Sequence, residues 1–150
     1  MPLEADRLAA AVGTEIGCSR WIDIGQERIN HFANVTEDWQ AIHLDEKAGK
    51  QAGFDGPVAH GFLILSMMSA MAYDALPQIE GQKTSINYGF DKLRFITPVL
   101  AGDAVRARFL LDAVEARDAH ALMLCLAVTV EIKDRPKPAL SALWRIIYTF

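Results

Sequence analysis

The chain has 150 residues, of which 51% are hydrophobic and 23% are charged. This length and composition predict one domain over residues 1–150 with a sizeable core, and they exclude a disordered protein. The formal net charge of −4 argues against a general nucleic-acid-binding protein, although local basic residues could still meet an anionic cofactor.

The cysteines and the hydropathy of the chain further limit the classes of protein to which it could belong. Cys18 and Cys125 form no metal-like cluster and are expected to be two buried free thiols, so we predict no metal site. The longest apolar run, residues 62–73, is too short to span a bilayer and contains Ser66 and Ser69. Nothing at the N-terminus resembles a signal peptide, and we therefore expect a cytoplasmic protein that does not enter membranes.

The first half of the chain is expected to form short helices joined by polar segments. Residues 3–12 predict a helix and residues 19–24 a strand. A second helix is expected over residues 26–35, because its apolar residues recur at helical spacing. The following segments are expected to be a loop over residues 36–45, a brief helix over Glu46–Gln51 and a turn over residues 53–57.

The second half predicts one helix followed by strands. Residues 61–74 are apolar on nearly every face, which favours a helix buried all round, with Met67, Met68 and Met71 in the core. After Thr84 the residues alternate as in strands, and a change of phase predicts a bulge near Asp91. Long strands with short connections favour an antiparallel sheet, so the fold class is α+β, with the sheet curled around the helix.

Asp38 and His43 carry most of the chemical signal. A carboxylate and an imidazole five residues apart can bind and activate one water. The alternative is that Asp38 caps a helical turn and His43 is a solvated loop residue. The neighbouring hydrophobic residues favour the first interpretation, because they would hold the pair against the core; these residues are Val35, Trp39, Ile42 and Leu44.

The segment around Gly61 offers the second part of a site. The backbone N–H of Gly61 would lie in the first turn of the apolar helix, where it could receive an oxygen that gains charge. Equally, Gly61 could simply allow the helix to pack tightly. His60 is expected to hydrogen-bond the preceding loop, whereas His43, on a polar loop, is expected to contribute little to packing.

These two segments resemble a known family. Phe32-Ala-Asn-Val-Thr-Glu-Asp38-Trp-Gln-Ala-Ile-His43-Leu-Asp45, with Gly53-Phe-Asp-Gly-Pro-Val-Ala-His60-Gly61, is similar to the MaoC-like hydratases of the hotdog superfamily. This group includes the (R)-specific enoyl-CoA hydratases. The Trp-Gln-x-Ile-His variant looks closest to the nodulation protein N-like branch. In its motifs the resemblance covers roughly residues 17 to 110.

The resemblance implies a hotdog fold, a homodimer and reversible hydration of trans-2-enoyl-CoA to (R)-3-hydroxyacyl-CoA. CoA, or an acyl carrier protein, would be part of the substrate, and no other cofactor is expected. Asp38 and His43 match the family's catalytic pair, and Gly61 matches the residue whose N–H polarises the thioester carbonyl. The side chains assigned to substrate binding are those of Gln40, His60, Phe62 and Asn87.

One departure from the family pattern and two rival functions accompany this prediction. Gln40-Ala41 stands where the commoner pattern has Asn-Pro, and the Gln40 amide could orient His43 through a longer arm. A hotdog thioesterase is a rival, but many of these carry an acid in the central helix and residues 62–73 contain none. A non-catalytic acyl-binding module is the second rival, and the presence of both Asp38 and His43 argues against it.

Overall fold

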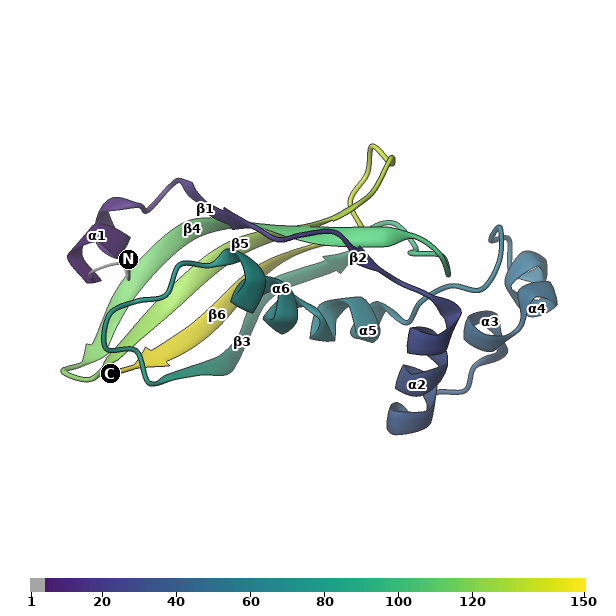
Figure 1. Ribbon diagram of the computed structural model, residues 1–150, viewed down its shortest axis with the longest axis horizontal. Helices are drawn as coiled ribbons and strands as arrows, with labels where there is room; N and C mark the ends of the chain where they lie inside the picture. The colour runs from purple at the N-terminus through teal and green to yellow at the C-terminus, as the bar shows by residue number, and fades with distance from the viewer. Residues whose placement is uncertain (1–4) are drawn as a thin grey trace.

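A curved antiparallel sheet forms one layer of the protein in the computed structural model, which describes residues 5–150 (Figure 1). Its six strands are β1 (Glu15–Cys18), β2 (Ile22–Asp23), β3 (Thr84–Phe95), β4 (Ala104–Asp118), β5 (Ala121–Ile132) and β6 (Leu140–Thr149). Their order is β1-β4-β5-β6-β3, and β2 also pairs with β4. Strand β3 therefore forms one edge of the sheet, which leaves one side of its backbone without a partner strand.

Two consecutive helices, α5 (Gly61–Ser66) and α6 (Met68–Ala75), lie against the concave face of the sheet (Figure 1). Met68 and Met71 from α6 pack in one core cluster with Phe109 of β4 and Leu126 of β5, and each of the four is at most 1% exposed. Burying a side chain of this size stabilises a fold by about 1.5–3 kcal/mol. The predicted α+β class, with a sheet curled around a helix, is confirmed.

The central helix differs from its prediction in two respects. It is interrupted at Met67, and the Ser66 hydroxyl donates to the Phe62 carbonyl at 2.7 Å, a side-chain bond of the kind that bends helices. It is also not buried all round, because Phe62 is 65% exposed and Tyr73 is 77% exposed. A single sheet covers only one side of the helix, so its opposite apolar face stays at the surface.

The sheet follows its predicted alternation closely. In β6 every second residue is buried: Leu140, Ala142, Trp144, Ile146 and Tyr148. The bulge expected near Asp91 is present, because the register of β3 against β6 shifts between Phe90 and Lys92. A second shift, which the sequence did not predict, lies between Asn87 and Gly89.

The N-terminal elements differ more from their predicted bounds. Helix α1 covers Ala5–Ala10, and the rest of the predicted helix before it lies outside the described residues. The strand expected over residues 19–24 is wrong in part: within this range only Ile22–Asp23 form a strand, β2, whereas Ser19 after the end of β1 bonds to β4 through its backbone and its hydroxyl. Cys125 is buried as expected, whereas Cys18 is exposed on this edge.

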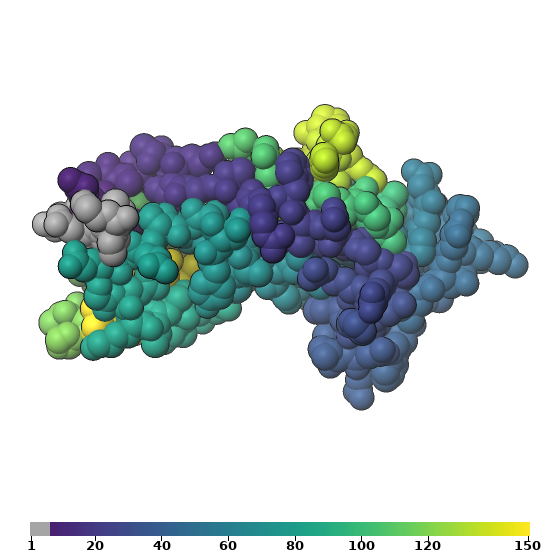
Figure 2. Space-filling view, viewed as in Figure 1, coloured from purple at the N-terminus to yellow at the C-terminus, as the bar shows by residue number. Residues whose placement is uncertain are grey.

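Helices α2 (Gln26–Thr36), α3 (Ala41–Leu44) and α4 (Glu46–Gln51) form a lobe beyond one end of the sheet (Figures 1 and 2). The prediction of α4 is confirmed; Asp45 caps it by accepting from the Ala48 N–H at 2.7 Å. The loop expected over residues 36–45 is wrong in part, because it contains α3. In the part of the chain that is described, no helix has both the length and the apolar character required to cross a membrane.

Candidate functional site

The candidate site lies where the helical lobe meets the start of the central helix. Helix α2 ends at Thr36, and the next residue, Glu37, has a φ of 61°, the left-handed conformation that commonly terminates helices. The chain then reverses direction, and the Asp38 backbone reaches His60, the residue that precedes α5. Two segments that are 22 residues apart in sequence therefore form one site.

His43 is buried, with 7% of its surface exposed, and lies in α3 rather than in an open loop. Its Nδ1 is 2.7 Å from the Val58 carbonyl oxygen, which can only accept, so Nδ1 carries the proton. The Nε2 atom of the neutral ring then keeps its lone pair and can accept a proton. The expectation that His43 contributes little to packing is wrong, because this bond ties α3 to the chain before α5.

His60 contacts both members of the predicted catalytic pair. Its Nε2 donates to the Asp38 carbonyl at 3.0 Å, so its expected hydrogen bond to the preceding loop is confirmed. Its ring also stacks on that of His43, with centroids 3.8 Å apart and planes at 23°, and the Phe32 ring covers it at 4.9 Å. His60 is only 2% exposed, and within the described chain its Nδ1 has no hydrogen-bond partner.

Asp38 presents its carboxylate at the open side of this cluster. The side chain is 49% exposed, and its Oδ2 lies 4.0 Å from His60 Nε2. One polar side-chain atom from each of Asp38, His43 and His60 lies within 4.8 Å of the others. Two acceptors that share one water at about 2.8 Å each, at a tetrahedral angle, are about 4.6 Å apart. The upper limit of 4.8 Å is compatible with one water held between the Asp38 carboxylate and a ring nitrogen.

The same three side chains are poorly arranged for a metal ion. Imidazole nitrogens coordinate a metal in the plane of the ring, along the lone pair. The rings of His43 and His60 are stacked, so their lone pairs lie in nearly parallel planes instead of converging on one point. His43 Nδ1 and His60 Nε2 are moreover engaged with backbone carbonyls. The geometry suits hydrogen bonding to water better than coordination.

Gly61 begins helix α5 directly after His60. A Cβ at this position would lie 3.0 Å from Cε1 of Phe95, so the absence of a side chain allows the start of the helix to pack against β3. The first N–H groups of a helix have no partner within the helix, and this leaves the Gly61 N–H able to donate. The packing role and the predicted role in binding an oxygen are therefore compatible.

The residues assigned to substrate binding do not all meet at this site. Gln40 precedes α3, and it contacts Asp38 through its backbone N–H, which lies 3.4 Å from Oδ1. Phe62 lies beside Gly61 and packs edge-on against Phe95, with ring centroids 6.0 Å apart. Asn87 is on β3 and lines a separate cavity beside α6. Of these four residues, His60 contacts both members of the pair, and Gln40 contacts Asp38 through its backbone.

Sequence reasoning missed the residues that hold His43 in place. Gln26 in the first turn of α2 donates through its side-chain amide to the His43 carbonyl at 2.8 Å and to Asn30 at 2.9 Å. This amide anchors α3, the task expected of Gln40. Of the four hydrophobic residues expected to bury the pair, Val35 and Trp39 do not do so, since they are 77% and 55% exposed, whereas Ile42 is partly buried. Contacts between segments distant in sequence provide the burial instead.

The chain is similar to several known proteins. A family model described as "MaoC like domain" matches residues 7–131. Nodulation protein N of Rhizobium meliloti (strain 1021) is 45% identical over 144 residues, which cover 95% of this chain and 89% of that protein. The 3-hydroxyacyl-thioester dehydratase Z of Mycobacterium tuberculosis (strain H37Rv) is 38% identical over 132 residues, covering 88% of this chain and 87% of that protein.

The solved structure of the (R)-hydratase from A. caviae is similar with a TM-score of 0.70 and 25% identity, covering 93% of this chain and 96% of that one. The chain has the hotdog fold. It belongs to the MaoC-like dehydratase family, whose members include hydratases and dehydratases. The predicted family and fold are therefore confirmed.

Proposed function

We propose that this protein is an (R)-specific hydratase that interconverts trans-2-enoyl-CoA and (R)-3-hydroxyacyl-CoA. The observation that carries the proposal is the pairing of the Asp38 carboxylate with His43, whose Nδ1 is committed to Val58 and whose Nε2 is therefore the basic atom. The relatives named for 3-hydroxyacyl-thioester dehydration and (R)-hydration support the same reaction class.

In the hydration direction, Asp38 and His43 hold one water between them. As the water oxygen forms a bond to C3 of the enoyl thioester, one water proton passes to the pair. The electrons of the C2–C3 double bond move toward the thioester carbonyl, whose oxygen gains negative charge. The Gly61 N–H donates to that oxygen.

The pair then returns the proton to C2, so that H and OH have added across the double bond and the protein is unchanged. Dehydration is the same sequence in reverse. His60 takes no proton in this scheme, because its Nε2–H is bonded to the Asp38 carbonyl and its ring lies flat on His43. It holds the two reacting side chains at their mutual distance.

Purified protein with crotonyl-CoA tests the proposal directly. Loss of the enoyl absorbance together with formation of the (R)-3-hydroxybutyryl thioester, identified by chiral chromatography, is the expected result. Release of free thiol without loss of the double bond would instead indicate a thioesterase. Binding without either reaction would indicate an acyl-binding module and would refute the proposed function.

A further inference from the structure

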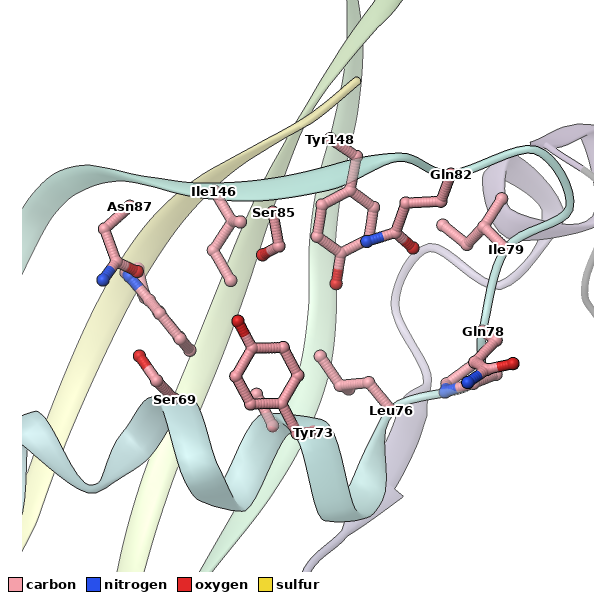
Figure 3. Close-up of a pocket in the computed structure, with 13 residues that line it drawn as sticks. Ser69, Tyr73, Leu76, Gln78, Ile79, Gln82, Ser85, Asn87, Ile146 and Tyr148 are labelled. Atoms are coloured by element: carbon pink, nitrogen blue, oxygen red, sulfur yellow. The ribbon is translucent and has the colours of Figure 1, made fainter. Parts of the chain in front are cut away.

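A cavity of about 360 Å³ lies beside the other end of the central helix (Figure 3). It is enclosed by α6, by β3 and β6, and by the connection that follows α6. Ser69, on its wall, comes eight residues after Gly61, which corresponds to about 12 Å along a helix axis. The cavity is thus separated from Gly61 by about two helical turns.

Further hollows continue from this cavity toward Gly61. A neighbouring hollow between the central helix and β3 shares Ser69, Asn87 and Trp144 with the cavity. Another one is lined by Gly61 and Phe62. The three follow one another along the same side of the central helix. The hollow at Gly61 shares no lining residue with the other two, so a chain bound as a thioester there would run along this side of the helix to reach the cavity.

Many of the side chains that line the cavity are polar, and those of Tyr73 and Asn87 are exposed at the surface. Figure 3 shows the hydroxyl groups of Tyr73 and Tyr148 facing the space between the helix and the sheet. Among the described residues, none of the polar side chains on these walls has a hydrogen-bond partner. They include Ser69, Tyr73, Gln82, Ser85, Asn87 and Tyr148.

Trp144 gives the second observation. It also lines the cavity, it is 3% exposed, and its indole Nε1 is a buried donor that has no partner in the described chain. Tyr148 is 6% exposed, and burial, followed by the nearby Tyr73, raises its pKa, so that its hydroxyl stays protonated and can donate. A buried donor without a partner destabilises the protein, and an acceptor that reached this nitrogen would offset that cost.

We infer that this cavity receives the distal part of the acyl chain and selects chains that carry an oxygen there, as a hydroxyl, keto or ether group. The inference rests on the proposed function and specifies its substrate class. A plain alkyl chain would displace water from these polar groups without replacing its hydrogen bonds. A site built in this way discriminates strongly against an analogue that lacks the bonding group.

The test compares trans-2-enoyl-CoA substrates of about eight to twelve carbons, chosen to span roughly 12 Å, with and without a hydroxyl at the distal carbon. We expect at least about ten-fold higher kcat/KM for the hydroxylated member of a pair, equivalent to about 1.4 kcal/mol. Trp144→Phe and Tyr148→Phe should each reduce this preference, measured as the ratio of kcat/KM for the two members of a pair. Trp21→Phe, outside the cavity, is the matched control and should retain the preference.

A binding measurement separates this inference from the proposed function. Calorimetry with saturated acyl-CoA, with and without the distal hydroxyl, needs no turnover, and the hydroxylated ligand should bind at least about ten-fold more tightly. Equal affinity for the two ligands, or a preference that persists in both cavity variants, would overturn the inference even if crotonyl-CoA is hydrated. Tighter binding of the hydroxylated acyl-CoA without any hydration of enoyl-CoA would instead refute the proposed function and support the oxygen-selective cavity.

Discussion

Replacing His43 should affect stability and activity separately, because its two ring nitrogens have different tasks. In His43→Ala the buried carbonyl of Val58 loses its hydrogen bond and the stack on His60 disappears. An unsatisfied buried acceptor costs about 1–3 kcal/mol. For a domain of this size, about 2 kcal/mol lowers Tm by about 4–8 °C. In His43→Asn the side-chain amide can still donate to Val58, so we expect less than half of that decrease.

Both variants lack Nε2 and should lose at least about two orders of magnitude in kcat/KM, the usual contribution of a general base. Thermal unfolding followed by circular dichroism gives Tm, and hydration of crotonyl-CoA gives kcat/KM. His31→Ala, on the exposed surface of α2, is the control and should change neither quantity. An unchanged Tm in His43→Ala, or an asparagine variant no more stable than the alanine variant, would refute the assignment of the Nδ1 proton. Substantial activity in either variant would refute the role of Nε2.

Three further predictions follow from the site, the sheet edge and one close backbone contact. Asp38→Asn and His43→Gln should each lower kcat/KM by about two to four orders of magnitude. The double variant should be little worse than either single variant, because both side chains act on one water. Independent, multiplicative losses would contradict this shared water. The protein should be a homodimer, because β3 carries exposed apolar side chains and one side of its backbone has no partner strand. A monomer mass by light scattering at micromolar concentration would exclude this. Gly17→Ala should destabilise the fold by about 1–3 kcal/mol, because the added Cβ would overlap the Ala75 carbonyl. Gly25→Ala, with open space around the added Cβ, should cost much less. Urea unfolding measures both free energies.

Local patterns predicted those parts of the fold in which one element meets a uniform environment. Strand β6 alternates because one of its faces packs on the core, and the bulge at Asp91 is visible as a change in that phase. The central helix was predicted less well. Its apolar residues indicate a hydrophobic helix, but they do not indicate which of its faces the sheet covers. Phe62 and Tyr73 lie on the uncovered face and are exposed.

For the candidate site, the sequence by itself determined which chemical groups were available. Asp38, His43 and the His60-Gly61 pair were identified from residue types and spacing. Only the tertiary structure decided how they are arranged, because their partners come from distant segments: Val58 selects the His43 tautomer, His60 links Asp38 and His43, and Gln26 anchors α3. Hydrogen-bond geometry and burial depend on contacts across the fold, and no short-range pattern in the chain encodes them.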